Sequence, residues 1–128
     1  MNENLLDCAA WKAMLDREDI PATDAFVGVV TREGFAQRRG KFLVWRGTAD
    51  GAEALLRDLH GEFDGDVAML LVADDDALQA VLAEGLGGIR PMVRSGRLHP
   101  YMLATLDEIE DAGLSDFVED LGLVFPRH

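Results

Sequence analysis

The sequence predicts an α+β fold, with a small mixed β-sheet made of an antiparallel hairpin and one βαβ unit, covered by about five helices. Two segments, 24–31 and 41–46, are rich in β-branched and aromatic residues, and a glycine-containing segment separates them. Residues 66–73 form an unbroken apolar run, typical of a strand buried on both faces. Segments with helical apolar spacing surround these strands. A three-layer α/β arrangement is the alternative.

The 128 residues predict a single globular domain, 1–128, which is long enough to bury a core without metal or disulfide cross-links. Cys8 is the only cysteine, which excludes an internal disulfide and favours a reducing compartment. The N-terminus lacks the features of a signal peptide, and no apolar run approaches the length of a membrane span. We therefore expect a cytoplasmic protein.

The first half of the chain is expected to begin with a helix over 4–18, because its apolar residues recur at helical spacing. The strands 24–31 and 41–46 are predicted to form a hairpin, with 32–40 as a long loop.

A second helix is predicted over 48–63. Asp50 and Glu53 have the spacing of a capping box, and Gly61 lies near its end. The apolar stripe of this predicted helix consists of Ala52, Leu55, Leu56 and Leu59. Strand 41–46, this helix and strand 66–73 would form a βαβ unit with parallel strands and a right-handed crossover.

In the second half, helical spacing predicts a helix over 74–88. Residues 89–94 are expected to form a short edge strand, since Pro91 is poorly tolerated in a central one. Pro100 suits the first turn of a helix over 99–113, and 114–122 has the pattern of a last short helix. The final residues, 123–128, are expected to be an extended, docked tail.

No group of residues predicts catalysis. The run Asp74, Asp75 and Asp76 follows a buried strand and resembles the first acidic strand end of a receiver domain, but no later apolar strand ends in aspartate. Acids in a first helical turn have a simpler role, since they complement the helix dipole. The histidines lack metal-ligand spacing, and the glycines of 84–91 follow a helix rather than a strand. We predict no catalytic residues, no metal and no cofactor.

Charge segregation is the more informative feature. The net charge of −12 disfavours nucleic acids and anionic membranes as partners. Segment 107–120 contains seven acids and no base. These are Asp107, Glu108, Glu110, Asp111, Asp116, Glu119 and Asp120. The first hypothesis is a non-enzymatic protein-binding module that uses these acids to engage a basic protein. In size and charge alone, it is similar to immunity proteins and secretion chaperones. The acids could instead simply form the solvated face of two amphipathic helices.

The basic residues support an alternative hypothesis. Many of them lie in two acid-free windows, 34–49 and 85–106. If these windows meet in space, their arginines could bind a small anion or nucleotide and make the domain a sensor. The candidate residues are Arg38, Arg39, Arg46, Arg90, Arg94 and Arg97. Pairing with the protein's own carboxylates is a competing role for them. A homodimer held by basic and acidic patches is a further possibility.

Overall fold

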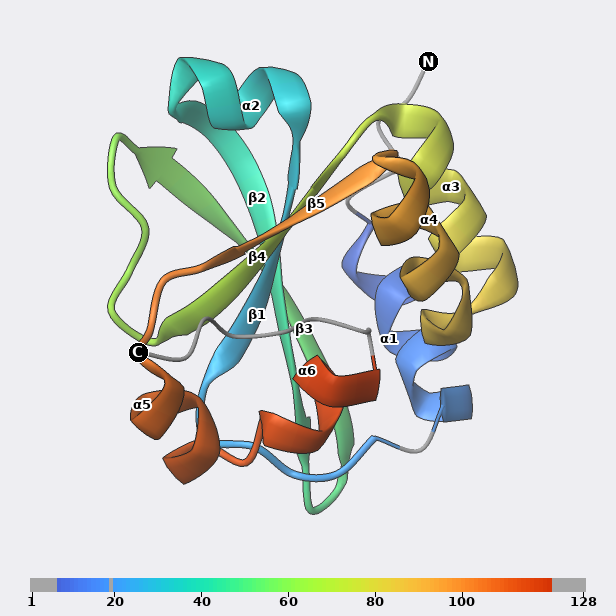
Figure 1. The fold of residues 1–128 in the computed structure, drawn as a ribbon, viewed down its shortest axis with the longest axis vertical. Coiled ribbons are helices and arrows are strands. Elements are labelled where there is room, and N and C mark those ends of the chain that lie inside the picture. The colour runs from blue at the N-terminus through green and yellow to red at the C-terminus, as the bar shows by residue number, and fades with distance from the viewer. Residues whose placement is uncertain (1–6, 19, 121–128) are drawn as a thin grey trace.

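A computed structural model describes residues 7–18 and 20–120. In this part of the chain one five-stranded sheet has the order β3-β2-β1-β4-β5 (Figure 1). The strands are β1 (Phe26–Thr31), β2 (Arg39–Thr48), β3 (Gly51–His60), β4 (Val67–Ala73) and β5 (Leu98–Met102). The helices are α1 (Cys8–Glu18), α2 (Arg32–Gln37), α3 (Asp75–Glu84), α4 (Ile89–Ser95), α5 (Leu106–Asp111) and α6 (Ser115–Asp120). A 3₁₀ turn (Leu86–Gly88) joins α3 to α4.

The sheet is mixed, as predicted, and the fold class is α+β. β1 pairs antiparallel with β2, which confirms the predicted hairpin, although its connection contains α2 rather than only loop. β1 pairs in parallel with β4, with Thr31 opposite Ala73 at their carboxyl ends. β4 pairs antiparallel with β5 at the second edge.

The predicted helix over 48–63 is wrong, because these residues form the turn and edge strand of a second hairpin. β3 pairs with β2 over ten residue pairs, from Arg39 opposite His60 to Thr48 opposite Gly51. The apolar stripe had helical spacing, but pairing with the buried β2 strand outweighs that local preference. The predicted βαβ unit is therefore also wrong, since the parallel partner of β4 is β1.

Two further predictions in the second half are wrong for reasons that involve proline. Residues 89–94 are helical in α4, where Pro91 lies in the first turn and its missing N–H removes no helical hydrogen bond. Pro100 lies in β5, an edge strand, which is the place in a sheet that tolerates proline. The following helix, α5, begins only at Leu106.

The predicted helices at 4–18, 74–88 and 114–122 correspond to α1, α3 and α6, with shorter bounds. The predicted tail, 123–128, and the first residues of the 4–18 helix lie outside the described residues.

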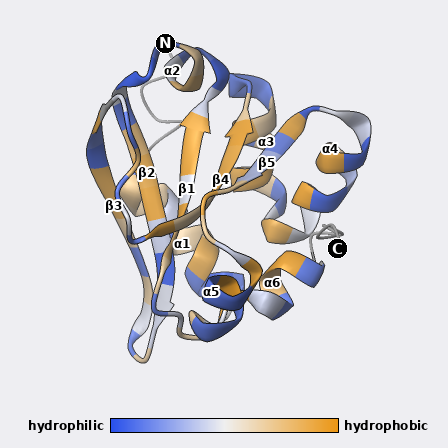
Figure 2. Ribbon diagram, turned by 60° about the vertical axis from the view of Figure 1, so that its left-hand side comes forward, coloured by the Kyte–Doolittle hydropathy of each residue, from blue (hydrophilic) through white to orange (hydrophobic). Residues whose placement is uncertain are grey.

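The two faces of the sheet are covered differently. On one face, buried residues of β1, β2 and β4 pack with buried residues of α1, α3, α4 and α6 and with Ile109 of α5. The other face forms a smaller cluster that includes Phe42, Val44 and Leu70, packed against Phe35 of α2 and Phe63. Figure 2 shows the apolar residues concentrated along β1 and β4 at the centre of the sheet. Because most helices contribute to one face, the structure is not the three-layer alternative.

In the part of the chain that the structure describes, no helix has both the length and the apolarity that crossing a membrane requires.

Candidate functional site

The acidic segment predicted from the sequence lies on α5 and α6, which are fixed to the sheet by their apolar sides. Ile109, Leu114 and Val118 are buried at this junction. Phe117 of α6 meets Trp45 of β2 edge to face, with ring centroids 5.2 Å apart. Burial of these side chains fixes the helices in place, since each fully buried aliphatic side chain contributes about 1.5–3 kcal/mol.

Hydrogen bonds fix the start and end of α5. Thr105 Oγ1 accepts from the Glu108 amide at 3.2 Å, and Glu108 Oε1 accepts from the Thr105 amide at 2.9 Å. This reciprocal pair is a capping box, and it lowers the pKa of the Glu108 carboxyl because the charged form accepts the hydrogen bonds. At the other end, the Asp24 amide donates to the Ala112 carbonyl at 3.0 Å.

The carboxylates on these two helices face solvent. We define the acidic α5–α6 surface as the six exposed acids Asp107, Glu108, Glu110, Asp111, Asp116 and Glu119. The side chain of Asp120, the seventh acid predicted from the sequence, is not among the described ones. Within the described residues, none of the six forms an ion pair. Among the described residues, this surface is therefore a concentration of negative charge without ion-pair partners.

Exposed apolar side chains lie directly before the acidic α5–α6 surface in the chain. Leu103 and Leu106 are 46% and 43% exposed. Tyr101 is 42% exposed but packs near Phe35 of α2, on the other face of the sheet from α5 and α6. Leu103 and Ala104 are held in place by hydrogen bonds from their amides to the Ala68 carbonyl, at 2.9 and 3.0 Å. Exposed aliphatic groups beside polar ones are typical of protein-binding surfaces.

Several basic side chains instead form ion pairs with carboxylates of the same chain. Arg57 donates to both carboxylate oxygens of Asp66, at 2.7 and 2.8 Å, and to Asp64 at 3.0 Å, while its guanidinium lies 4.8 Å from the Phe26 ring centroid. The pairing lowers the pKa of Asp66 and raises that of Arg57. Arg46 pairs with Glu53 at 3.3 Å, and Lys41 pairs with Asp58.

The six arginines of the anion hypothesis do not form one cluster. Arg39 and Arg46 lie seven residues apart on β2, which separates them by about 23 Å along the strand. Arg38 instead lies over the Phe35 ring, 4.5 Å from its centroid. Arg90 and Arg94 are exposed on α4, and Arg97 is exposed in the turn that follows.

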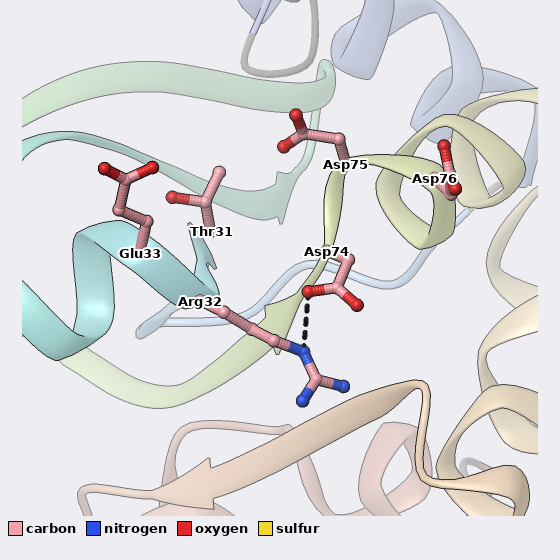
Figure 3. A pocket seen from close by; sticks show the side chains of 6 residues that line it. All are labelled: Thr31, Arg32, Glu33, Asp74, Asp75 and Asp76. Carbon is pink, nitrogen blue, oxygen red and sulfur yellow. Dashed lines mark ion pairs between the residues drawn. The ribbon is translucent and has the colours of Figure 1, made fainter.

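A hollow of about 560 Å³ lies where the parallel strands β1 and β4 end (Figure 3). It is lined by Thr31, Arg32, Glu33, Asp74, Asp75 and Asp76. Sequence reasoning assigned the aspartates to a helix start and did not identify Arg32 beside them. Ligand sites of α/β proteins form at the carboxyl ends of neighbouring parallel strands. This rule would point to the hollow, but only once β1 and β4 are known to be parallel neighbours.

Arg32 occupies this hollow as a structural cross-link. Its Nε lies 2.9 Å from Asp74 Oδ1, an ion pair without hydrogen-bond geometry, and its Nη2 donates to the Gly96 and Arg97 carbonyls at 3.0 Å each. In Figure 3 the carboxylates of Glu33 and Asp76 lie on opposite sides of the hollow and do not converge. The arginine joins the ends of β1 and β4 to the turn before β5, and the remaining negative charge disfavours an anionic ligand.

Other candidate chemistry is scattered. Cys8 is half-buried at the start of α1 and packs against the core, and burial together with neighbouring Asp7 raises the pKa of its thiol. A raised pKa reduces the thiolate fraction and hence reactivity. In residues 7–18 and 20–120, no three histidine, cysteine or carboxylate side chains are placed to hold a metal ion.

No known protein-family model matches the chain, and no curated protein matches it in sequence.

Proposed function

We propose that this chain is a non-enzymatic protein-binding module whose acidic α5–α6 surface engages a basic protein partner. The observation that carries the proposal is the set of six exposed carboxylates that have no ion pair in the described part of the chain. Like charges repel one another when gathered on one surface, which costs stability unless a positive partner compensates them.

The neighbouring apolar side chains support a protein partner over a small cation. Leu103 and Leu106 offer exposed apolar side chains at the start of α5, next to its acids in the chain. Apolar contacts stabilise a protein complex, whereas charges around them mainly raise the association rate and select the partner. A basic protein that presents arginine or lysine side chains around an apolar centre fits this combination, and binding would neutralise or shield its charge.

We also infer a cytoplasmic location, since the sole cysteine of the chain, Cys8, cannot form an internal disulfide.

The test compares three proteins as bait for partners at low salt. A surface variant carries Asp107→Asn, Glu110→Gln, Asp111→Asn and Asp116→Asn. A control variant carries the same loss of four charges at exposed acids elsewhere, namely Asp50→Asn, Glu62→Gln, Asp76→Asn and Glu84→Gln.

We expect a protein that binds the unmodified chain and the control variant in a fixed ratio, and that binds the surface variant at least about tenfold more weakly. Equal binding to all three proteins would show that these carboxylates do not contribute to binding. Equal weakening of both variants would show that net charge alone attracts the partner, and either result would contradict the assigned surface.

A further inference from the structure

The two edges of the sheet differ in their capacity to pair with another strand. β3 is ten residues long, contains no proline and pairs with β2 in one unbroken register. β5 is five residues long and contains Pro100, which has no amide hydrogen to donate. Proteins commonly protect sheet edges with short strands, prolines and bulges. By these criteria β5 is the better protected edge, while at one end of β3 the outward Ala52 amide donates to Asp16 of α1. In Figure 2, β3 lies at the left-hand margin of the sheet.

The hydrogen bonds of β3 identify which backbone groups are directed away from β2. The Ala52 amide donates to Asp16 Oδ1 at 2.8 Å and so is not used in the ladder with β2. Residues of an antiparallel strand direct their amides and carbonyls alternately to the two sides. In the unbroken register, Ala54, Leu56 and Asp58 therefore share the outward direction of Ala52.

The middle of β3 also exposes two large apolar side chains, one on each face of the sheet. Leu55 is 41% exposed and Leu56 is 47% exposed. Leu55 is opposite Val44 and shares its face, whereas Leu56 is opposite Leu43 and shares the other face. An exposed apolar edge strand with free backbone groups favours the addition of a further strand.

We propose that β3 pairs antiparallel with β3 of a second copy of this chain, about a two-fold axis at Leu55. Leu55 would then lie opposite Leu55 of the second copy, and Ala54 opposite the second Leu56. The outward backbone groups of Ala54 and Leu56 form the hydrogen-bonded pairs in this register, as the ladder geometry requires. The two five-stranded sheets become one continuous sheet.

Charge complementarity selects this register. Successive side chains of a strand point to opposite faces of the sheet, and β3 pairs with β2 without a break in register. Glu53, Leu55 and Arg57 therefore lie on the same face of β3. The two-fold at Leu55 brings Glu53 opposite Arg57 of the second copy, twice per dimer. Within each copy, Arg46 contacts only Oε2 of Glu53, and the aspartates contact only the terminal nitrogens of Arg57. Within residues 7–18 and 20–120, no ion pair or hydrogen bond uses Glu53 Oε1 or Arg57 Nε. Opposite charges in directly facing positions stabilise antiparallel strands.

The mass in solution tests the dimer. We expect light scattering to give twice the 14.0 kDa chain mass. Ala54→Pro removes an outward amide, and Leu55→Lys places two like charges opposite each other, so each should raise the dimer dissociation constant at least about tenfold. Gln79→Lys, which adds the same charge at an exposed position on α3, should leave the mass unchanged. A monomeric unmodified chain at millimolar concentration overturns the proposal, and so does a dimer that persists in both β3 variants.

A cysteine pair tests the register without disturbing the fold. In a Cys8→Ser background, Leu55→Cys places two thiols in a directly facing pair whose Cα separation of about 4.5 Å permits a disulfide. Leu56→Cys is the matched control, because its own symmetry mate lies diagonally across, about 7–8 Å away. We expect oxidation to cross-link the Leu55→Cys protein faster. Faster cross-linking of the Leu56→Cys protein, or none of either, overturns the register.

Discussion

The basic residues of β2 and β3 and the acidic residues of α5 and α6 are used in opposite ways. Lys41, Arg46 and Arg57 each pair with a carboxylate of the same chain. The six acids of the acidic α5–α6 surface face solvent without an ion pair in the described residues. The net charge of −12 is therefore unevenly distributed, because the sheet neutralises part of its own charge and the two helices do not.

This difference separates charges that maintain the fold from charges that are free to meet a partner. The bases of the acid-free window 34–49 look in the sequence like a binding site, yet Arg46 pairs with Glu53, and Arg32, just before this window, joins three segments. Arg90, Arg94 and Arg97 have exposed side chains on α4 and its following turn, where the Arg97 carbonyl accepts a hydrogen bond from Arg32.

The largest expected effect comes from removing the apolar support of the acidic α5–α6 surface. Ile109 is fully buried beneath α5. We expect Ile109→Ala to lower the free energy of unfolding by about 2–5 kcal/mol, because it leaves a cavity between α5 and the sheet. Urea denaturation measures this. The control Leu106→Ala, at a 43% exposed position of the same helix, should change the free energy by less than about 0.5 kcal/mol. Equal losses would contradict the role of Ile109 as an anchor.

A smaller loss of stability should follow from removing Arg57, the basic side chain that pairs with two aspartates. Arg57→Ala removes charged hydrogen bonds to two aspartates and a contact with Phe26. Because these groups are partly exposed, we expect a loss of about 1–2 kcal/mol by urea denaturation. Arg94→Ala, at an exposed position on α4, should cost less than about 0.5 kcal/mol. If the two substitutions cost the same, the distinction between structural and free charges fails.

The smallest effect is a dependence on pH. Asp66 has a lowered pKa in the folded chain, chiefly because Arg57 donates hydrogen bonds to its charged form. Its contribution to stability is present above its unfolded pKa of about 3.9 and is lost as pH falls through the lower folded value. Asp66→Asn should therefore be less stable than the unmodified chain at neutral pH, with a difference that narrows below about pH 4. Thermal unfolding across this range measures the difference.

The Arg57→Ala background provides the control for the pH experiment. Without the guanidinium, the main cause of the lowered Asp66 pKa is absent. Asp66→Asn should then have little pH-dependent effect. An unchanged pH dependence in this background would assign the effect to another group.

Part of the fold could be predicted from the sequence because local and long-range preferences agree there. The buried strand β4 and the strands of the β1–β2 hairpin have strongly apolar, β-rich sequences. β3 could not be predicted, since Leu55, Leu56 and Leu59 fit a helical stripe and only pairing with β2 makes them a strand. Pro91 and Pro100 were assigned to the wrong elements for a related reason. Both the first turn of a helix and an edge strand accept proline.

The acidic part of the candidate site was visible in the sequence, since seven acids without a base in 107–120 need no structure to be noticed. The apolar part was not, because Leu103 and Leu106 were expected within a single helix over 99–113 with Leu106 on its buried side, whereas the structure exposes both. Nor could the sequence show that Arg32 contacts Asp74 and the turn before β5, since that contact depends on parallel pairing of strands far apart in the chain.

The most direct test of the central claim is the dissociation constant for the captured partner, measured by calorimetry over a range of salt concentrations. For the unmodified chain and for the control variant at Asp50, Glu62, Asp76 and Glu84, we predict that binding weakens steeply and equally with salt. For the surface variant at Asp107, Glu110, Asp111 and Asp116, we predict weaker binding at low salt and a flatter salt dependence. The same affinity and the same salt dependence for all three proteins would contradict the assignment of the acidic α5–α6 surface as the binding site.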